Sequence, residues 1–157
     1  MKLRSVLLDR GFIEALLQPD HPSHRSAVRI YGTLVDGYED RTKRLYGLST
    51  VLADVPRDVR NTALAPLTLA RVAGQHRRAA AHTRVANLPP EAALSLVMMR
   101  RERMRAVATV GHDFDRFEIE VLYAAPDAEL VESSDAVPEG YVSYETAPLP
   151  APRSTGG

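Results

Sequence analysis

The stretch Ser5–Ile13 reads SVLLDRGFI and joins a short apolar run, a single carboxylate at Asp9 and the start of an apolar helical pattern. The apolar run has no polar alternation, which is typical of a strand buried on both faces in a parallel sheet. The pattern therefore predicts a strand over 3–9 followed by a helix over 11–18. Asp9 would then lie at the carboxyl end of the strand, where open α/β sheets place their functional sites.

The rest of the chain alternates short apolar runs with helical patterns. Apolar runs predict further strands at 45–48, 106–110 and 119–123, and apolar periodicity predicts helices at 24–37, 67–86 and 91–103. Ser23 is the expected N-cap of the helix at 24–37. Another helical pattern follows Ser49, and Pro56 interrupts it, so this helix is expected either to kink at Pro56 or to begin near Asp54. Strands that alternate with helices indicate an α/β fold with a mainly parallel central sheet.

The 157 residues divide by composition into a patterned body and an acidic tail. Residues 1–124 are long enough for one domain with its own core. Residues 125–157 are rich in Pro, Ser and Glu, so they are predicted to be largely disordered. Residues 1–121 carry 19 Lys and Arg against 14 Asp and Glu, a net charge of +5, and residues 122–157 carry 1 against 6, a net charge of −5. A basic body is compatible with a polyanionic ligand, and equally with a solvated surface beside a solubilising tail.

Composition also excludes several classes of protein. The chain has no cysteine, which excludes disulfides, thiolate metal sites and cysteine nucleophiles. The longest apolar runs are far shorter than a membrane span needs. The short apolar run after the first residues contains Asp9 and does not make a signal peptide. The protein is therefore expected to be cytoplasmic, with no membrane partner.

Four carboxylates fall at the ends of predicted elements, namely Asp9, Asp54, Glu91 and Asp113. Clustered carboxylates repel one another unless a cation neutralises them, and their hard oxygen atoms suit Mg²⁺ or Mn²⁺. Two such ions can hold the attacking water and the leaving oxygen during phosphodiester cleavage. The alternative is that Asp54 and Glu91 are helix N-terminal acids favoured by the helix dipole, and that Asp113 is an ordinary turn residue.

These acids belong to a series of motifs that resembles the PIN-domain family, and particularly the VapC-like ribonuclease toxins of toxin–antitoxin modules. The motifs are residues 6–17, Asp20–His24, Ser49–Val55, Glu91–Arg103 and Ala108–Phe114, and the likeness spans residues 3–123. The resemblance implies a three-layer α/β/α sandwich and metal-dependent hydrolysis of RNA, with Asp9, Asp54, Glu91 and Asp113 as catalytic residues that hold Mg²⁺ or Mn²⁺. It also implies an antitoxin protein as partner and a homodimer.

The chain departs from the family pattern at four positions. Asp54 stands where the family has Glu, and Gly111 stands where it has Asp. The third family acid is matched by Glu91, or in an equally good alignment by Ala92. Arg10 replaces the small residue that often follows the first Asp. These departures motivate a second hypothesis, in which the domain has lost catalysis and acts as an RNA- or protein-binding module.

Basic residues supply candidates for contact with RNA. The segment 71–105 holds eight Arg against two acidic residues, a pattern that predicts phosphate contacts or a solvated helical face. The expected RNA-binding residues are Arg10, Arg77, Arg78, Arg100, Arg101 and His112, the last because it adjoins Asp113. The spacing of His21 with His24, and of His76 with His82, does not match a zinc signature, so these histidines are expected to be surface or capping residues.

Overall fold

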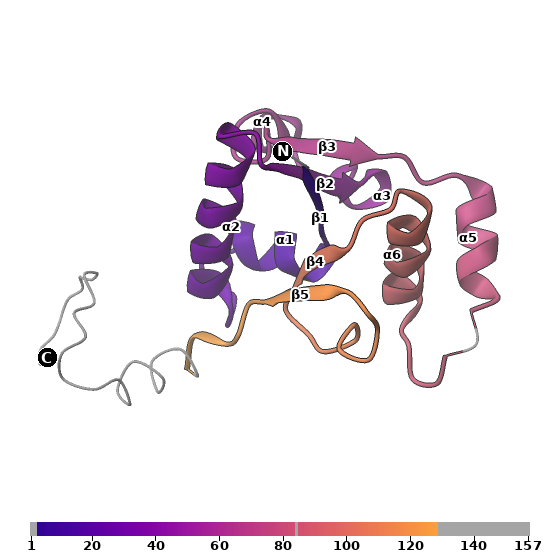
Figure 1. Cartoon of the computed structure of the whole chain (residues 1–157). Coiled ribbons are helices and arrows are strands. Elements are labelled where there is room, and N and C mark those ends of the chain that lie inside the picture. The colour runs from indigo at the N-terminus through magenta and orange to yellow at the C-terminus, as the bar shows by residue number, and fades with distance from the viewer. Residues whose placement is uncertain (1–2, 84, 129–157) are drawn as a thin grey trace, which may run out of the picture. The chain divides into compact units, whose positions relative to one another are not determined.

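The computed structural model describes residues 3–83 and 85–128, and most of the predicted tail lies outside the described residues. A five-stranded parallel sheet forms the centre of this part of the chain, in the order β3-β2-β1-β4-β5 (Figure 1). The strands are β1 (Arg4–Leu8), β2 (Lys43–Leu48), β3 (Leu67–Ala70), β4 (Ala106–Thr109) and β5 (Glu120–Tyr123). The strand at the centre, β1, is the apolar run that opened the sequence, and Leu7 and Leu8 on it are fully buried.

Helices cover both faces of the sheet. The helices are α1 (Arg10–Leu17), α2 (His24–Glu39), α3 (Ser49–Leu52), α4 (Arg57–Asn61), α5 (Gly74–Ala81) and α6 (Pro90–Arg101). Figure 1 shows α1 and α2 on one side of the sheet and α5 and α6, packed together, on the other. The predicted three-layer α/β/α sandwich is therefore confirmed. In the part of the chain that the structure describes, no helix is long and apolar enough to cross a membrane.

The strand order places a topological switch point beside β1. From β1 the chain moves outward through β2 to β3, and it then returns to the other side of β1 to form β4 and β5. The chain therefore continues from β1 and from β4 in opposite directions along the sheet. Open α/β sheets bind their ligands at this point, and Asp9 follows β1 there.

The predicted helix over 67–86 is wrong in its first part. Residues 67–70 form strand β3, which pairs in parallel register with Leu45–Leu48 of β2, and the helix α5 begins only at Gly74. Pro66 and the alternation of Leu67, Thr68 and Leu69 are compatible with a strand, and the pairing with β2 outweighs the weak helical pattern.

Pro56 splits the helical pattern after Ser49 into two short helices. Helix α3 ends at Leu52, and Pro56 occupies the N-cap position of α4 with a φ of −55°. Neither predicted form, a kinked helix or a helix starting near Asp54, is present. A proline has no N–H to donate and its φ is already helical, so it fits just before the first turn of α4 without breaking a hydrogen bond.

The N-terminus of α2 is capped by a residue from the far end of the domain. Ser23 precedes α2 as predicted, yet its side chain makes no capping hydrogen bond. The Asp127 carboxylate instead accepts hydrogen bonds from the N–H groups of Arg25 and Ser26, each at 3.3 Å, and the Asp127 N–H donates to the Pro22 carbonyl. Ordered contacts thus continue past residue 124, the predicted end of the domain.

Candidate functional site at the carboxyl edge of the sheet

Asp9 lies at the switch point and links β1, α1 and β4. Its N–H donates to the Ala108 carbonyl at 3.1 Å, which fixes the end of β1 against β4. Its Oδ1 accepts from the Phe12 N–H at 2.9 Å as the N-cap of α1, and its Oδ2 accepts from the Thr109 hydroxyl at 2.6 Å. Both carboxylate oxygens of Asp9 are therefore already hydrogen-bonded within the protein.

Burial raises the pKa of Asp9 from 3.8 to about 6. The hydrogen bonds from Thr109 and Phe12 act in the opposite direction because they stabilise the charged carboxylate. The negative charges of Asp113 and Glu91 raise the pKa further, so these two carboxylates are near enough to repel Asp9. Asp9 therefore changes its charge close to neutral pH.

Gly11 permits the close approach of α1 to the end of β4. A Cβ atom at Gly11 would lie 2.8 Å from Cγ2 of Val110, well inside van der Waals contact. Because glycine has no Cβ, the first turn of α1 can pack directly beside the strand that carries Thr109. This contact keeps the Thr109 hydroxyl within hydrogen-bonding distance of Asp9.

Arg10 is bound by two of the four predicted metal ligands. Its Nη1 donates to Oδ2 of Asp54 at 2.9 Å, and its Nε donates to Oε2 of Glu91 at 3.0 Å. Its Nη2 also reaches the Thr50 carbonyl at 3.5 Å. The hydrogen bond to Asp54, followed by that to Glu91, raises the pKa of Arg10 despite partial burial. Arg10 thus joins the N-termini of α1 and α6 to the turn after α3.

The carboxylates of this edge, as arranged, do not fit the predicted Mg²⁺ or Mn²⁺. Within residues 3–83 and 85–128, no group of three or more His, Asp or Glu side chains is placed to hold a metal ion. Asp54 and Glu91 face a guanidinium, and the oxygens of Asp9 are used by Phe12 and Thr109. A divalent ion would have to displace a cation that is already in place.

The last predicted motif contributes an exposed turn beside this site. The Nδ1 atom of His112 is hydrogen-bonded to Oδ2 of Asp115 at 2.8 Å, and the centroid of its ring lies 4.4 Å from that of Tyr123. Asp113 is exposed, and it is the carboxylate that most strongly affects Asp9. A Cβ at Gly111 would meet nothing within 4 Å, so no close contact requires a glycine there.

Three of the other four histidines are bonded to backbone groups. His21 accepts from the Ser23 N–H at 3.0 Å, and the His24 ring is bonded to the Ala15 carbonyl at 2.8 Å. His76 is buried and accepts from the Ala73 N–H at 2.9 Å at the start of α5.

The predicted RNA-binding arginines are not brought together at Asp9. Arg77 and Arg78 are exposed on α5, whereas Arg100 and Arg101 end α6, the helix that begins beside Glu91. A helix rises 1.5 Å per residue, so Arg100 lies roughly 14 Å along the axis from Glu91. Arg10 and His112 lie at the carboxyl edge, and both are hydrogen-bonded to carboxylates there.

Thr109 is the site residue that sequence reasoning missed. It is buried, and it is the hydroxyl partner of Asp9 across 100 positions of the chain. The signal was its place as the polar residue within the run 106–110, at the end of an otherwise apolar strand. Its partner depends on the adjacency of β1 and β4, which local pattern does not reveal.

The comparisons with known proteins agree with the fold. No family model matches the sequence, and no curated protein matches it significantly. Among solved structures, the chain is similar to VapC20 of Mycobacterium tuberculosis, described as a sarcin–ricin loop cleaving toxin. The TM-score is 0.52 and the sequence identity 14%, over 70% of this chain and 92% of VapC20. The chain therefore has a VapC-like α/β fold.

Proposed function

We propose that the protein is a PIN-like RNA-binding module in which Arg10, in place of a metal ion, neutralises carboxylates at the carboxyl edge of the sheet. The observation that carries this proposal is the double pairing of Arg10 with Asp54 and Glu91. A guanidinium between two carboxylates supplies the charge compensation that a cation would otherwise supply. The alternative function deduced from the sequence, a domain that has lost catalysis, is thus favoured by the site geometry.

Two observations support RNA as the ligand. VapC20, which shares the fold, is described as cleaving the sarcin–ricin loop, which is RNA. The residues up to 121 have a net charge of +5, from 19 Lys and Arg against 14 Asp and Glu, and all but two of the chain's basic residues are arginine. Arginine suits planar, bidentate contact with phosphate. An antitoxin-type partner and a homodimer remain predictions from the resemblance, and a cytoplasmic location remains a prediction from the apolar pattern of the sequence.

The proposal is tested with the purified full chain and a fluorescently labelled single-stranded RNA. Fluorescence anisotropy is expected to show binding that weakens with rising salt and does not change when EDTA replaces Mn²⁺. Gel analysis of the same mixtures is expected to show intact RNA. Cleavage that requires Mn²⁺ and disappears in the Asp9→Asn variant would contradict the proposal, as would the absence of RNA binding at low salt.

Arg10→Gln tests the role of the guanidinium directly. The variant removes the cation and leaves Asp54 and Glu91 without their partner, so it is expected to bind Mn²⁺ more tightly than the wild type in isothermal titration calorimetry. The double variant with Asp9→Asn should lose part of that gain. The side chains of Arg10, Asp54 and Glu91 are 30%, 65% and 52% exposed, so stability should change by less than about 1 kcal/mol. Equal Mn²⁺ affinity in wild type and variant would refute the role of Arg10.

The second candidate is the metal-dependent ribonuclease that the resemblance implies. It is favoured by the gathering of Asp9, Glu91 and Asp113 at the switch point, where Glu91 and Asp113 both repel Asp9. In this case Asp9, Asp54, Glu91 and Asp113 would hold Mg²⁺ or Mn²⁺ once Arg10 had moved away. The cleavage assay above separates the two candidates, because only the ribonuclease yields fragments.

A further inference from the structure

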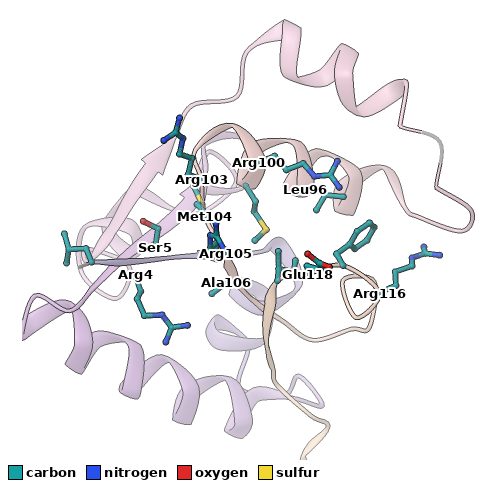
Figure 2. A pocket seen from close by; sticks show the side chains of 14 residues that line it. Arg4, Ser5, Leu96, Arg100, Arg103, Met104, Arg105, Ala106, Arg116 and Glu118 are labelled. Carbon is teal, nitrogen blue, oxygen red and sulfur yellow. The ribbon is translucent and has the colours of Figure 1, made fainter. Parts of the chain in front are cut away.

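A cavity of about 1180 Å³ lies at the amino-terminal edge of the sheet, at the opposite ends of the strands from Asp9. It is bordered by the start of β1, the start of β4, the end of α6 and the loop before β5 (Figure 2). Ligand pockets in proteins usually measure roughly 300 to 1,000 Å³, so the cavity is large enough for an extended ligand. Five arginines line it, namely Arg4, Arg100, Arg103, Arg105 and Arg116.

Two of these arginines hold the walls of the cavity in place. Arg4 is paired with Glu120 of β5. Arg116 donates to the Ala86 carbonyl at 2.7 Å, and its guanidinium lies 5.8 Å from the centre of the Phe117 ring. These contacts tie the start of β1 to β5 and the loop before β5 to the turn before α6.

The other three arginines have no carboxylate partner in the described part of the chain. Among the residues that the structure describes, none of Arg100, Arg103 and Arg105 lies within ion-pair distance of an acidic side chain, and all three are exposed. Glu118 is the single acidic residue in the described lining. The cavity therefore presents an excess of positive charge with at least three guanidinium groups available to a ligand.

Arg103 has a backbone conformation that glycine would adopt at lower cost. It follows the C-cap residue Glu102 of α6 with a φ of 58°, and the next residue, Met104, donates its N–H to the Met99 carbonyl at 2.8 Å. This is the helix-ending motif whose left-handed position is usually glycine. Arg103 therefore has a side chain at a position where a positive φ disfavours one. That side chain lines the cavity (Figure 2).

Apolar side chains form the rest of the wall. Leu96 and Met99 of α6, Met104 after it, and Phe117 and Ile119 before β5 line the same cavity. Leu96, Met99 and Met104 are buried, so the half-buried Phe117 and Ile119 form the accessible part of this wall. An aromatic ring beside guanidinium groups suits a nucleotide, because the phosphate contacts the cations while a base packs on the ring. A purely acidic peptide would use the cations and leave this wall without a matching group.

We propose that this cavity binds single-stranded RNA, with phosphate groups on Arg100, Arg103 and Arg105 and a base against the wall that contains Phe117. The inference rests on the proposed function and gives it a location, at the sheet edge opposite the carboxylates. Charge favours this edge, because the carboxyl edge carries Asp9, Asp54, Glu91 and Asp113, and Arg10 there is already paired with two of them.

The chain offers a matched pair of variants for the test. Arg41 follows the C-cap residue of α2 in the same way that Arg103 follows the C-cap residue of α6. Its φ is 66°, and the N–H of the next residue, Thr42, donates to the Gly37 carbonyl at 2.8 Å. Arg41 is exposed and does not line the cavity. Arg41→Gly and Arg103→Gly therefore remove the same charge at the same kind of backbone position, and both are expected to keep or raise the melting temperature.

RNA affinity of the full-length variants is measured by fluorescence anisotropy over a range of salt concentrations. Arg103→Gly is expected to weaken binding several-fold and to lower the slope of log K against log salt by about 0.7, the value for one phosphate contact on a single strand. The triple variant, which adds Arg100→Gln and Arg105→Gln, should reduce the steepness of this slope by about 2 in total relative to the wild type. Arg41→Gly should leave both quantities close to those of the wild type.

Three outcomes would overturn the inference. Equal effects of Arg103→Gly and Arg41→Gly in a wild type that binds RNA would refute the cavity while leaving the proposed function intact. Absence of RNA binding by the wild type at low salt would refute both. Competition by poly-glutamate as strong as that by unlabelled RNA of equal charge would show that the cavity takes an acidic chain and not a nucleic acid.

Discussion

At the scale of single residues, the neighbours Asp9 and Arg10 have opposite charges and different partners. Asp9 is a carboxylate withdrawn from water and held by Phe12 and Thr109. Arg10 turns away from Asp9 and compensates Asp54 and Glu91. The pair of residues thus leaves Asp9 without a cation of its own, which is why burial can raise its pKa to about 6.

The raised pKa of Asp9 makes folding stability depend on pH. The folded state binds a proton at this carboxyl more tightly than the unfolded state, with a pKa of about 6 against 3.8. The free energy of unfolding therefore falls as pH rises from about 4 to 6, by up to about 3 kcal/mol. Asp9→Asn cannot ionise and keeps an N-cap acceptor for Phe12. Urea denaturation should find this variant more stable than the wild type at pH 8 and similar to it at pH 4.

Thr109→Val serves as the comparison for that experiment. It removes the hydroxyl that stabilises the charged form of Asp9, so the wild-type loss of stability between pH 4 and 6 should become larger. A stability profile in which Asp9→Asn retains the wild-type pH dependence would show that another group is responsible.

At the scale of elements, the site depends on how closely α1 approaches β4. Gly11→Ala places a methyl group 2.8 Å from Cγ2 of Val110, so the helix or the Val110 side chain must shift to relieve the contact. We expect a loss of about 1 to 3 kcal/mol in the free energy of unfolding, measured by urea denaturation. The shift should also separate Thr109 from Asp9.

Gly32→Ala is the matched control within a helix. A Cβ at Gly32 of α2 would meet nothing within 4 Å, so alanine should stabilise this helix by about 0.5 to 1 kcal/mol. Opposite signs for the two substitutions would confirm that contact with β4, and not helix propensity, decides the residue at position 11. Stabilisation by both would refute the close approach.

At the scale of the whole domain, charges separate along the strands of the sheet. Carboxylates gather at the carboxyl edge around Asp9, and arginines gather at the amino edge around the end of α6. Helix α6 connects the two, with Glu91 in its first turn and Arg100 and Arg101 in its last. An acid at the N-terminus and cations at the C-terminus interact favourably with the helix dipole, so this separation of charge also stabilises α6.

The domain is also closed by a contact between distant parts of the chain. Asp127 caps α2 through the N–H groups of Arg25 and Ser26. Asp127→Ala is expected to cost about 1 kcal/mol in the free energy of unfolding, measured by urea denaturation. Ser23→Ala, at the local N-cap position whose side chain makes no capping bond, should cost less. A larger cost at Ser23 would assign the cap to the local residue.

Local sequence patterns were sufficient to predict the central strands and the parallel sheet of this protein. The strand, carboxylate and helix of Ser5–Ile13 and the buried strand β4 follow from apolar runs and a cap, which act between residues close in the chain. The alternation of such units predicts a parallel sheet, and with it the position of Asp9 at the carboxyl edge.

The tertiary structure alone decided what surrounds Asp9. The strand β3 depends on pairing with β2, and the bonds of Arg10 to Asp54 and Glu91 cross 44 and 81 positions of the chain. The arginine-lined cavity likewise combines residues from β1, α6 and the loop before β5. Contacts of this kind depend on which side chains packing brings together, and the pKa of Asp9 depends on burial, so neither is contained in a local pattern.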